Sequence, residues 1–192
     1  MPESAQTVLD FWFLPEASAG HGAARREWFS KDGAFDRQIG ARFGALIRQA
    51  LAGELPEWAG VSGALARILL LDQFTRNAGR DTAAAFAGDA LALAAAQNLV
   101  GSGGDLLLPP LQRSFVYMPF EHAEDMAMQE RALALFTALC AAAPGHAGML
   151  DYARRHRAII ARFGRFPHRN LILGRPSTPQ ELEFLRQPGS GF

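Results

Sequence analysis

Cysteine and lysine are almost absent from this chain. Cys140 is the one cysteine among 192 residues, so an internal disulfide bond and a cysteine-based zinc site are both excluded. Cys140 also shares a helical stripe with Phe136, which indicates an inert core thiol rather than a nucleophile. Lys31 is the one lysine, so arginine carries nearly all of the positive charge. Arginine is the better residue for buried, bidentate pairing with carboxylates.

The chain also lacks an excess of either charge, a long hydrophobic run and an N-terminal targeting sequence. Its 19 basic and 19 acidic residues balance, which removes the simplest electrostatic argument for binding nucleic acid or anionic membrane. The strongest apolar run, residues 64–71, is interrupted by Arg67 and is far too short to span a bilayer. Residues 1–13 contain Glu3 and Asp10 but no basic residue, unlike a secretory signal or transit peptide. We therefore expect a soluble cytoplasmic protein with neither a nucleic-acid nor a membrane partner.

Strand-like alternation is absent, and the spacing of apolar residues is helical throughout. Phe35, Ile39, Phe43, Ile47 and Leu51 recur every four residues, which predicts a helix over 34–53. With no solenoid-length repeat and no linker, residues 1–192 are predicted to form a single all-α domain of six to eight helices, packed mostly as antiparallel hairpins. Further helices are predicted over 4–13, 61–77, 83–99, 119–142 and from about 146 to 163, with an irregular crossing over 108–118 and a short last helix opened by a capping box at Thr178 and Glu181.

The helix predicted over 119–142 carries polar residues on an otherwise apolar stripe. His122 and Gln129 share this stripe with apolar residues at its far end, so both should point inward. Glu121, Glu124 and Asp125 crowd the same first turns. The helix dipole favours such charges by roughly 0.3–1 kcal/mol each when exposed, but three carboxylates repel one another and need cations nearby.

Residues 162–175 interleave arginines with aromatic rings, which predicts a partly buried segment that meets opposite charge. If the two preceding helices form an antiparallel hairpin that turns near Gly145, His122 lies opposite residue 169 or so. The acidic cluster should then meet Arg165, His168 and Arg169. The same register places His156 opposite Leu135, on the order of 20 Å along the hairpin from His122. We therefore expect no metal site made of these two histidines.

The helix predicted over 61–77 contains a second polar group in apolar surroundings. Asp72 and Arg76 can pair at a separation of four residues, and both should be at least half buried. Asn77, Arg80 and Asp89 follow closely and can extend the network. Asp72 is either a catalytic base or one half of a structural ion pair.

Several ordered motifs are spread over nearly the whole chain: Phe11-Trp12-Phe13, Trp28-Phe29, Asp72-Gln73-Phe74-Thr75-Arg76-Asn77, the stretch from Phe115 to Glu124, and the arginine-aromatic segment with its Leu173-Gly174-Arg175 tail. In these motifs the chain resembles the bacterial domain-of-unknown-function family 924. The resemblance implies an all-α fold of the tetratricopeptide-like superfamily. It implies no catalytic residues. The tryptophan-leucine-glycine-tyrosine pattern of true tetratricopeptide repeats is missing, which argues against a peptide-binding solenoid.

Three functions are compatible with these residues. The leading hypothesis is a pocket for a small anionic metabolite, formed by the start of helix 119–142 and segment 162–175, with no metal or other cofactor. Arg165 and Arg169 would anchor the anion and His122 would donate or accept a proton. The alternatives are a helical-hairpin module that binds another protein or a second copy of the chain, and a metal-dependent hydrolase using Glu121, His122 and Glu124. Whether the protein is an enzyme stays open; catalytic candidates are His122 and Asp72, and ligand-binding candidates are Arg76, Glu121, His122, Glu124, Arg165, His168 and Arg169.

Overall fold

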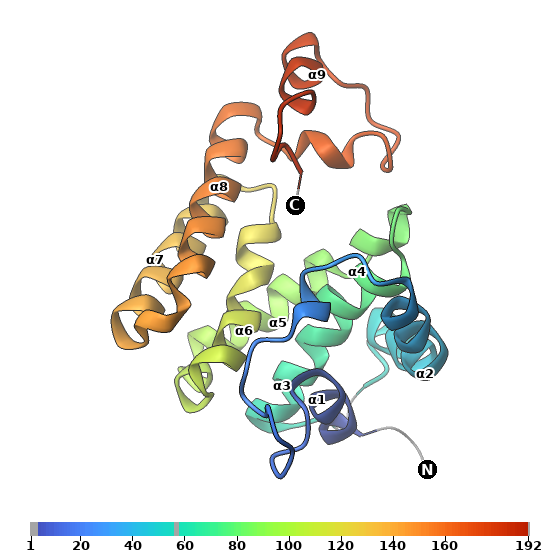
Figure 1. The fold of residues 1–192 in the computed structure, drawn as a ribbon, viewed down its shortest axis with the longest axis vertical. Helices are drawn as coiled ribbons and strands as arrows, with labels where there is room; N and C mark the ends of the chain where they lie inside the picture. The colour runs from blue at the N-terminus through green and yellow to red at the C-terminus, as the bar shows by residue number, and fades with distance from the viewer. Residues whose placement is uncertain (1–3, 56–57, 192) are drawn as a thin grey trace.

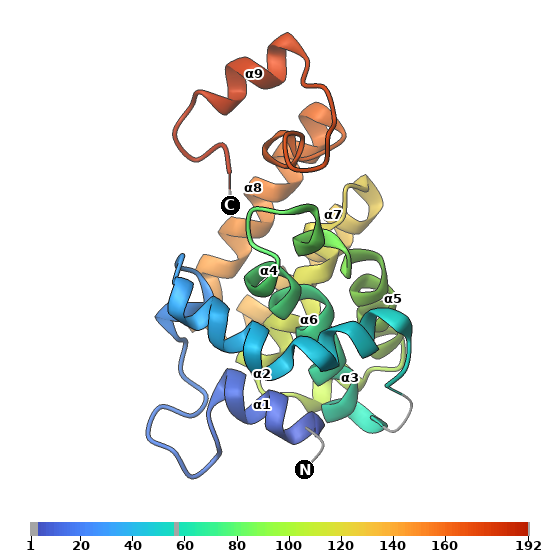
Figure 2. The same cartoon turned by 90° about the vertical axis from the view of Figure 1, so that its right-hand side faces the viewer.

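The computed structural model describes residues 4–55 and 58–191, and within these ranges every regular element is helical, as predicted. Figures 1 and 2 show the helices packed against their neighbours in a single body, with the last segment of the chain lying beyond the end of α8. The α-helices are α1 (Ala5–Phe13), α2 (Gly33–Ala52), α3 (Gly60–Ile68), α4 (Thr75–Ala78), α5 (Asp89–Gly101), α6 (Pro110–His122), α7 (Met126–Ala142), α8 (Ala147–Phe163) and α9 (Pro179–Leu185).

Aromatic side chains dominate the centre of the core. Trp12 and Trp28 stack with ring centroids 5.7 Å apart, and both meet the edge of Phe115. All three side chains are buried and belong to the main core cluster. The predicted helices over 4–13 and 34–53 are confirmed, as α1 and α2. Helix α2 begins after an Asp32 cap and ends at Gly53 in the left-handed region.

The predicted central helix over 61–77 is confirmed and contains an irregular turn. Between α3 and α4 the helix widens into a π-helical turn over Leu69–Phe74, and all six of its residues are buried. The Thr75 hydroxyl donates to the carbonyl oxygens of Leu71 and Asp72, at 2.8 and 3.1 Å. Such π turns occur frequently at functional sites, and this one carries Asp72.

The predicted single helix over 119–142 is wrong, and so is the irregular crossing over 108–118. Pro119 lies inside α6, which begins at Pro110 and ends at His122. The chain then becomes extended at Ala123, and Asp125 caps the start of α7 by accepting from the Met128 amide at 3.0 Å. Proline is common in the first turn of a helix, which is why Pro119 was expected to open one. In the structure, Pro110 occupies the first turn of α6, and Pro119 lies inside that helix. The break between α6 and α7 changes the register of the whole site.

Residues 83–101 form two elements rather than the predicted helix over 83–99. A 3-10 turn at Ala83–Phe86 comes first, and α5 begins only at Asp89. By length and composition alone, Ala83–Gly101 is apolar enough to cross a membrane, with a mean hydropathy of 1.3. However, α5 itself is only about 20 Å long, shorter than a bilayer core. Its residues Ala92, Ala96 and Leu99 belong to the core cluster.

The last part of the chain folds back over the ends of the central helices. A 3-10 turn at Pro144–His146 joins α7 to α8, which pack side by side as predicted, and α8 ends at Gly164 in the left-handed region. A 3-10 turn at Pro167–Arg169 follows, and the predicted capping box of Thr178 and Glu181 opens α9. In Figure 1 this C-terminal segment arches above the helical body. Its residue Arg169 contacts Phe86 and Asp89, which lie between α4 and the start of α5.

Candidate functional site

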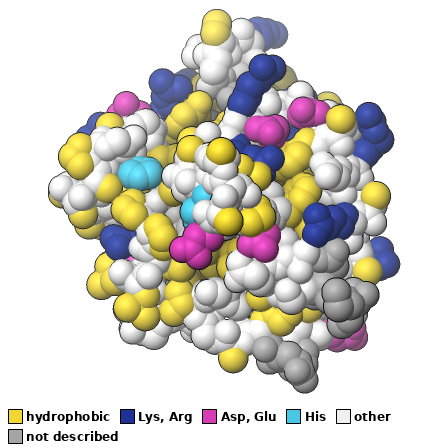
Figure 3. Space-filling view, turned by 60° about the horizontal axis from the view of Figure 1, so that its bottom comes forward, with side chains coloured by type: hydrophobic (Ala, Val, Ile, Leu, Met, Phe, Trp, Pro, Cys, Tyr) yellow, Lys and Arg dark blue, Asp and Glu magenta, His cyan; other side chains and the backbone are white. Residues whose placement is uncertain are grey.

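Five helical elements and the C-terminal segment meet at one polar centre. The five helical elements are the π turn with Asp72, α4 with Arg76, the start of α5 with Asp89, the end of α6 with Glu121 and His122, and α8 with His156; the turn after α8, in the C-terminal segment, contributes Arg169. Figure 3 shows that acidic and basic side chains are interspersed with apolar ones on the face it views, instead of gathering into a patch of one sign.

Asp72 is the most deeply enclosed charge of the site, with no exposed surface. One carboxylate oxygen accepts from His122 Nδ1 at 2.6 Å, and the other accepts from Gln73 Nε2 at 2.7 Å. Arg76 Nη2 lies 4.0 Å from the first oxygen, so the predicted pair of Asp72 with Arg76 is confirmed. Burial alone would raise the pKa of Asp72, but the charge and hydrogen bond of His122, with Arg76 and Gln73, lower it to about 2.

Two arginines share the carboxylate of Asp89. Arg76 pairs with both oxygens, at 2.7 and 2.9 Å, and Arg169 donates to one of them at 3.2 Å. Both guanidinium groups also lie over the ring of Phe86, at 4.6 and 4.7 Å, and Arg169 lies 4.5 Å from the centre of the Phe166 ring. Burial, followed by the charge of Arg76, lowers the pKa of Arg169 to about 10. The centre thus concentrates two cations on one carboxylate.

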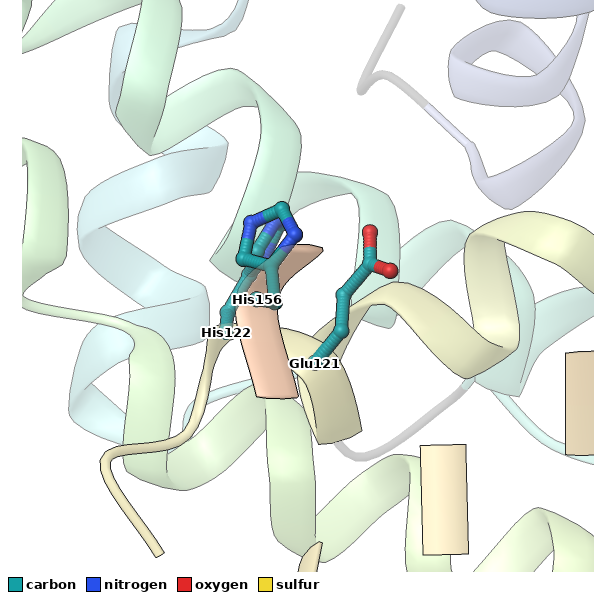
Figure 4. Close-up of side chains that lie close together, drawn as sticks. All are labelled: Glu121, His122 and His156. Carbon is teal, nitrogen blue, oxygen red and sulfur yellow. The ribbon is translucent and has the colours of Figure 1, made fainter. Parts of the chain in front are cut away.

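Glu121, His122 and His156 lie together, as Figure 4 shows. One ligand atom from each residue lies within 4.8 Å of the other two, and the two imidazole ring centres are 5.9 Å apart. The predicted separation of about 20 Å is therefore wrong. It assumed an unbroken helix over 119–142, whereas His122 ends α6 and reaches α8 from a different direction.

Glu124 holds the C-terminal segment against the site. Its pairing with an arginine of that segment was predicted, but the arginine is Arg175 and not one of the predicted partners. Arg175 grips both carboxylate oxygens at 2.5 and 2.9 Å, and the Phe166 amide donates to one of them at 2.7 Å. Arg165, which was expected to meet the acidic cluster, pairs instead with Glu181 at 2.7 and 2.8 Å. Asp125 is likewise used as a helix cap.

Removal of the Arg175 guanidinium should loosen the segment that it holds. In Arg175→Ala, Glu124 loses two charged hydrogen bonds, which we expect to cost on the order of 2 kcal/mol. Amide exchange should accelerate over 164–191 before it does in α1 to α3. Arg186→Ala is the control, because Arg186 forms only an exposed pair with Glu183. Uniform acceleration over the whole chain would contradict this local role.

The structure brings some predicted site residues together and separates others. Asp72, Arg76, Glu121, His122 and Arg169 converge on the centre. The His168 ring lies 5.7 Å from the Phe166 ring, and burial, followed by the charge of Arg169, lowers the pKa of His168 to about 4. Glu124 and Arg165 instead form the ion pairs that hold the last segment.

Two residues of the centre were undervalued by the sequence analysis. The predicted hairpin register puts His156 opposite Leu135, far from His122, and the sequence indicates Asp89 only as an extension of the Asp72 network. The excess of inward-facing arginines, which requires more carboxylates than the predicted acidic cluster supplies, is a signal that points to Asp89.

The fold and the site define a class: an all-α protein with a buried polar centre, closed by its own C-terminal segment. The chain belongs to the family described as bacterial proteins of unknown function (DUF924), which it matches over residues 8–189. It is similar to a solved structure titled a protein of unknown function, ATU0120 from Agrobacterium tumefaciens. The two are 41% identical, with a TM-score of 0.82, and the alignment covers 94% of this chain and 96% of that one. Among curated proteins none matches. Membership of the tetratricopeptide-like superfamily stays a prediction.

Proposed function

We propose that this protein binds a small anionic metabolite at the guanidinium groups of Arg76 and Arg169, beside His122. The observation that carries the proposal is the sharing of one carboxylate, Asp89, by two arginines. The Arg76 and Asp89 side chains keep about a fifth of their surface exposed, at 20% and 23%. An anion can therefore approach Arg76 from solvent and accept bidentate hydrogen bonds there, whereas Arg169, whose side chain is 7% exposed, offers only a small part of its surface.

The charges around the two arginines favour an incoming anion. Burial and the charge of His122 lower the pKa of His156 to about 3. Beside the two arginines, the charge of Arg76 adds to burial in lowering the pKa values of His168 and Arg169, so further positive charge is unfavourable next to this pair. A bound anion would reduce that repulsion. His122, held by Asp72 at 2.6 Å, is the group placed to donate a proton to the anion or accept one from it.

Calorimetric titration and thermal unfolding in the presence of EDTA test this proposal. Inorganic phosphate is the first probe, followed by phosphorylated and carboxylate metabolites. We expect a saturating ligand to raise the melting temperature of the wild type by mass action. At a ligand concentration of 100 times Kd, the free energy of unfolding should rise by about 3 kcal/mol. Arg169→Lys should bind at least tenfold more weakly, because lysine cannot reproduce a stacked, bidentate contact.

Arg157→Lys is the matched control, since Arg157 forms only a largely exposed pair with Glu130. It should bind anions as the wild type does. If no anion stabilises the wild type, or if both variants lose affinity equally, the proposed anion site is refuted.

The alternative of a protein-interaction module has weaker support. An open groove of about 480 Å³ is lined by Trp58, Val61 and Leu99, among others, and Leu106 and Leu107 nearby in sequence are largely exposed. Arg67, Asn98 and Ser102 also line this groove, so it is less apolar than a docking surface for a helix would be. The hydrolase alternative loses one of its three groups, because Arg175 and the Phe166 amide occupy the carboxylate oxygens of Glu124.

A further inference from the structure

We infer that Glu121, His122 and His156 form a binding site for a divalent transition-metal ion, with Zn²⁺ as the best fit. Glu121 and His122 end α6, and His156 lies in the middle of α8. Their ligand atoms lie within 4.8 Å of one another. Ligands about 2.0–2.1 Å from a tetrahedral zinc ion lie about 3.3 Å apart, so small side-chain rotations would close the set around the ion.

Both histidines are held in the tautomer that a metal requires. The Nδ1 atom of His122 lies 2.6 Å from an Asp72 carboxylate oxygen, and the Nδ1 atom of His156 lies 2.9 Å from the backbone carbonyl oxygen of Tyr152. Carboxylate and carbonyl oxygens only accept hydrogen bonds, so each Nδ1 carries the hydrogen. In the neutral ring the lone pair is then on Nε2. This arrangement, with an oxygen behind each imidazole, is characteristic of metal-binding histidines.

Glu121 is a buried carboxyl group whose ionised form a cation would stabilise. Its side chain is 5% exposed, and its Oε2 atom has no hydrogen-bond partner among the described residues. The arginines of the centre pair with other carboxylates: Arg76 and Arg169 with Asp89, and Arg175 with Glu124. Burial and the charge of Asp72 raise the pKa of Glu121. A buried carboxyl group without compensation is unfavourable, and a metal ion would provide that compensation.

The donor set favours zinc over the harder cations. Two imidazoles and one carboxylate are the protein ligands of many catalytic zinc sites, which keep a further position open. The same set also binds iron(II), whereas magnesium and calcium prefer oxygen ligands throughout. The His122 side chain is 16% exposed, so the site reaches the surface on that side.

This site does not depend on the proposed anion site, because it uses neither arginine. The two sites share only His122. In the metal site its Nε2 lone pair would bind the ion, whereas in the anion site the same lone pair is free to accept a proton. Asp72 would act as a positioning residue for the ligand His122.

Titration of EDTA-stripped protein with ZnCl₂, followed by calorimetry and elemental analysis, tests the site. We expect one zinc ion per chain. Loss of an outer partner of a metal-binding histidine already costs roughly 10–100-fold in affinity, so loss of a ligand in Glu121→Gln or His156→Phe should cost about 100-fold or more. His21→Asn is the matched control, since His21 is exposed and lies outside the set. It should bind as the wild type does.

Thermal unfolding with and without Zn²⁺ gives a second test, which still applies if a variant is less stable than the wild type. Zn²⁺ should raise the melting temperature of the wild type and leave that of Glu121→Gln unchanged.

Two results would overturn the inference. One is a wild-type protein that takes up no stoichiometric zinc. The other is equal stabilisation of the wild type and Glu121→Gln by Zn²⁺, which would place the ion elsewhere. Neither result would bear on anion binding, which is measured in EDTA with Arg169→Lys.

Discussion

Asp72→Asn is expected to lower the free energy of unfolding by about 3–5 kcal/mol at pH 7, the cost of breaking a buried charge pair from one side. The carboxylate accepts hydrogen bonds from His122 and from Gln73. An asparagine has only one accepting oxygen, so its amide NH₂ group must face one of these two donors. The charge that faces Arg76 is lost at the same time. Urea denaturation at pH 7 measures the change directly.

The cost of Asp72→Asn should shrink in acid. The folded pKa of Asp72 is lowered from 3.8 to about 2, which corresponds to roughly 2 kcal/mol of stabilisation of the ionised form. A lowered carboxyl pKa stabilises the fold above the unfolded value, and this contribution disappears as the pH falls through the folded value. The difference between wild type and variant should therefore be complete above about pH 4 and narrow towards pH 2.

Asp151→Asn is the control for this substitution. Asp151 pairs with Arg154 at 2.9 Å, but both side chains are more than 60% exposed. Exposed pairs contribute about 0–1 kcal/mol, so this variant should unfold close to the wild type at every pH. A small effect of Asp72→Asn at pH 7, or an effect that does not change between pH 7 and pH 3, would show that Asp72 is not held as a charge.

Helices whose ends and apolar stripe agree were predictable from the sequence. Helix α2 has a four-residue apolar stripe, an aspartate cap at its start and a glycine at its end, and each signal gives the same bounds. The capping box of α9 was equally clear. The α6–α7 region was mispredicted because Pro119 is compatible with a first turn, while the true break lies at Ala123 and contains neither proline nor glycine. Its signal is the cap at Asp125, a residue that was interpreted only as a charge.

The candidate site was predicted in composition but not in pairing. The approach of residues 121–125 to the arginine-aromatic segment was predictable because unpaired inward charges require partners. The choice among several arginines for each carboxylate was not predictable, since it depends on ångström-scale register. The break at 123–125 lets α7 fold back against α6. The resulting register brings His156 to His122 and pairs Arg175, not Arg165, with Glu124. Local patterns therefore fixed which groups are buried, whereas tertiary packing decided which groups meet.

Gly88→Ala is expected to destabilise the protein by about 3 kcal/mol, near the upper end of the usual cost of overpacking. Gly88 precedes α5 and packs against the π turn, so that a Cβ atom added there would lie 2.0 Å from the backbone oxygen of Leu71. A backbone atom cannot rotate aside, and the Thr75 hydroxyl already holds that oxygen. The start of α5 must therefore move away, and it carries Asp89, the shared partner of Arg76 and Arg169.

The matched control is Gly40→Ala, in the middle of α2. No atom lies within 4 Å of a Cβ atom added at Gly40, so alanine should stabilise the helix there by about 0.5–1 kcal/mol. Urea denaturation of both variants separates the loss of a close approach from the general effect of replacing glycine. In Gly88→Ala we also expect weaker anion binding than in Gly40→Ala, because displacement of Asp89 disturbs both arginines. Equal stability of the two variants would show that the turn before α5 is free to shift, and that the position of Asp89 is not set by its contact with the π turn.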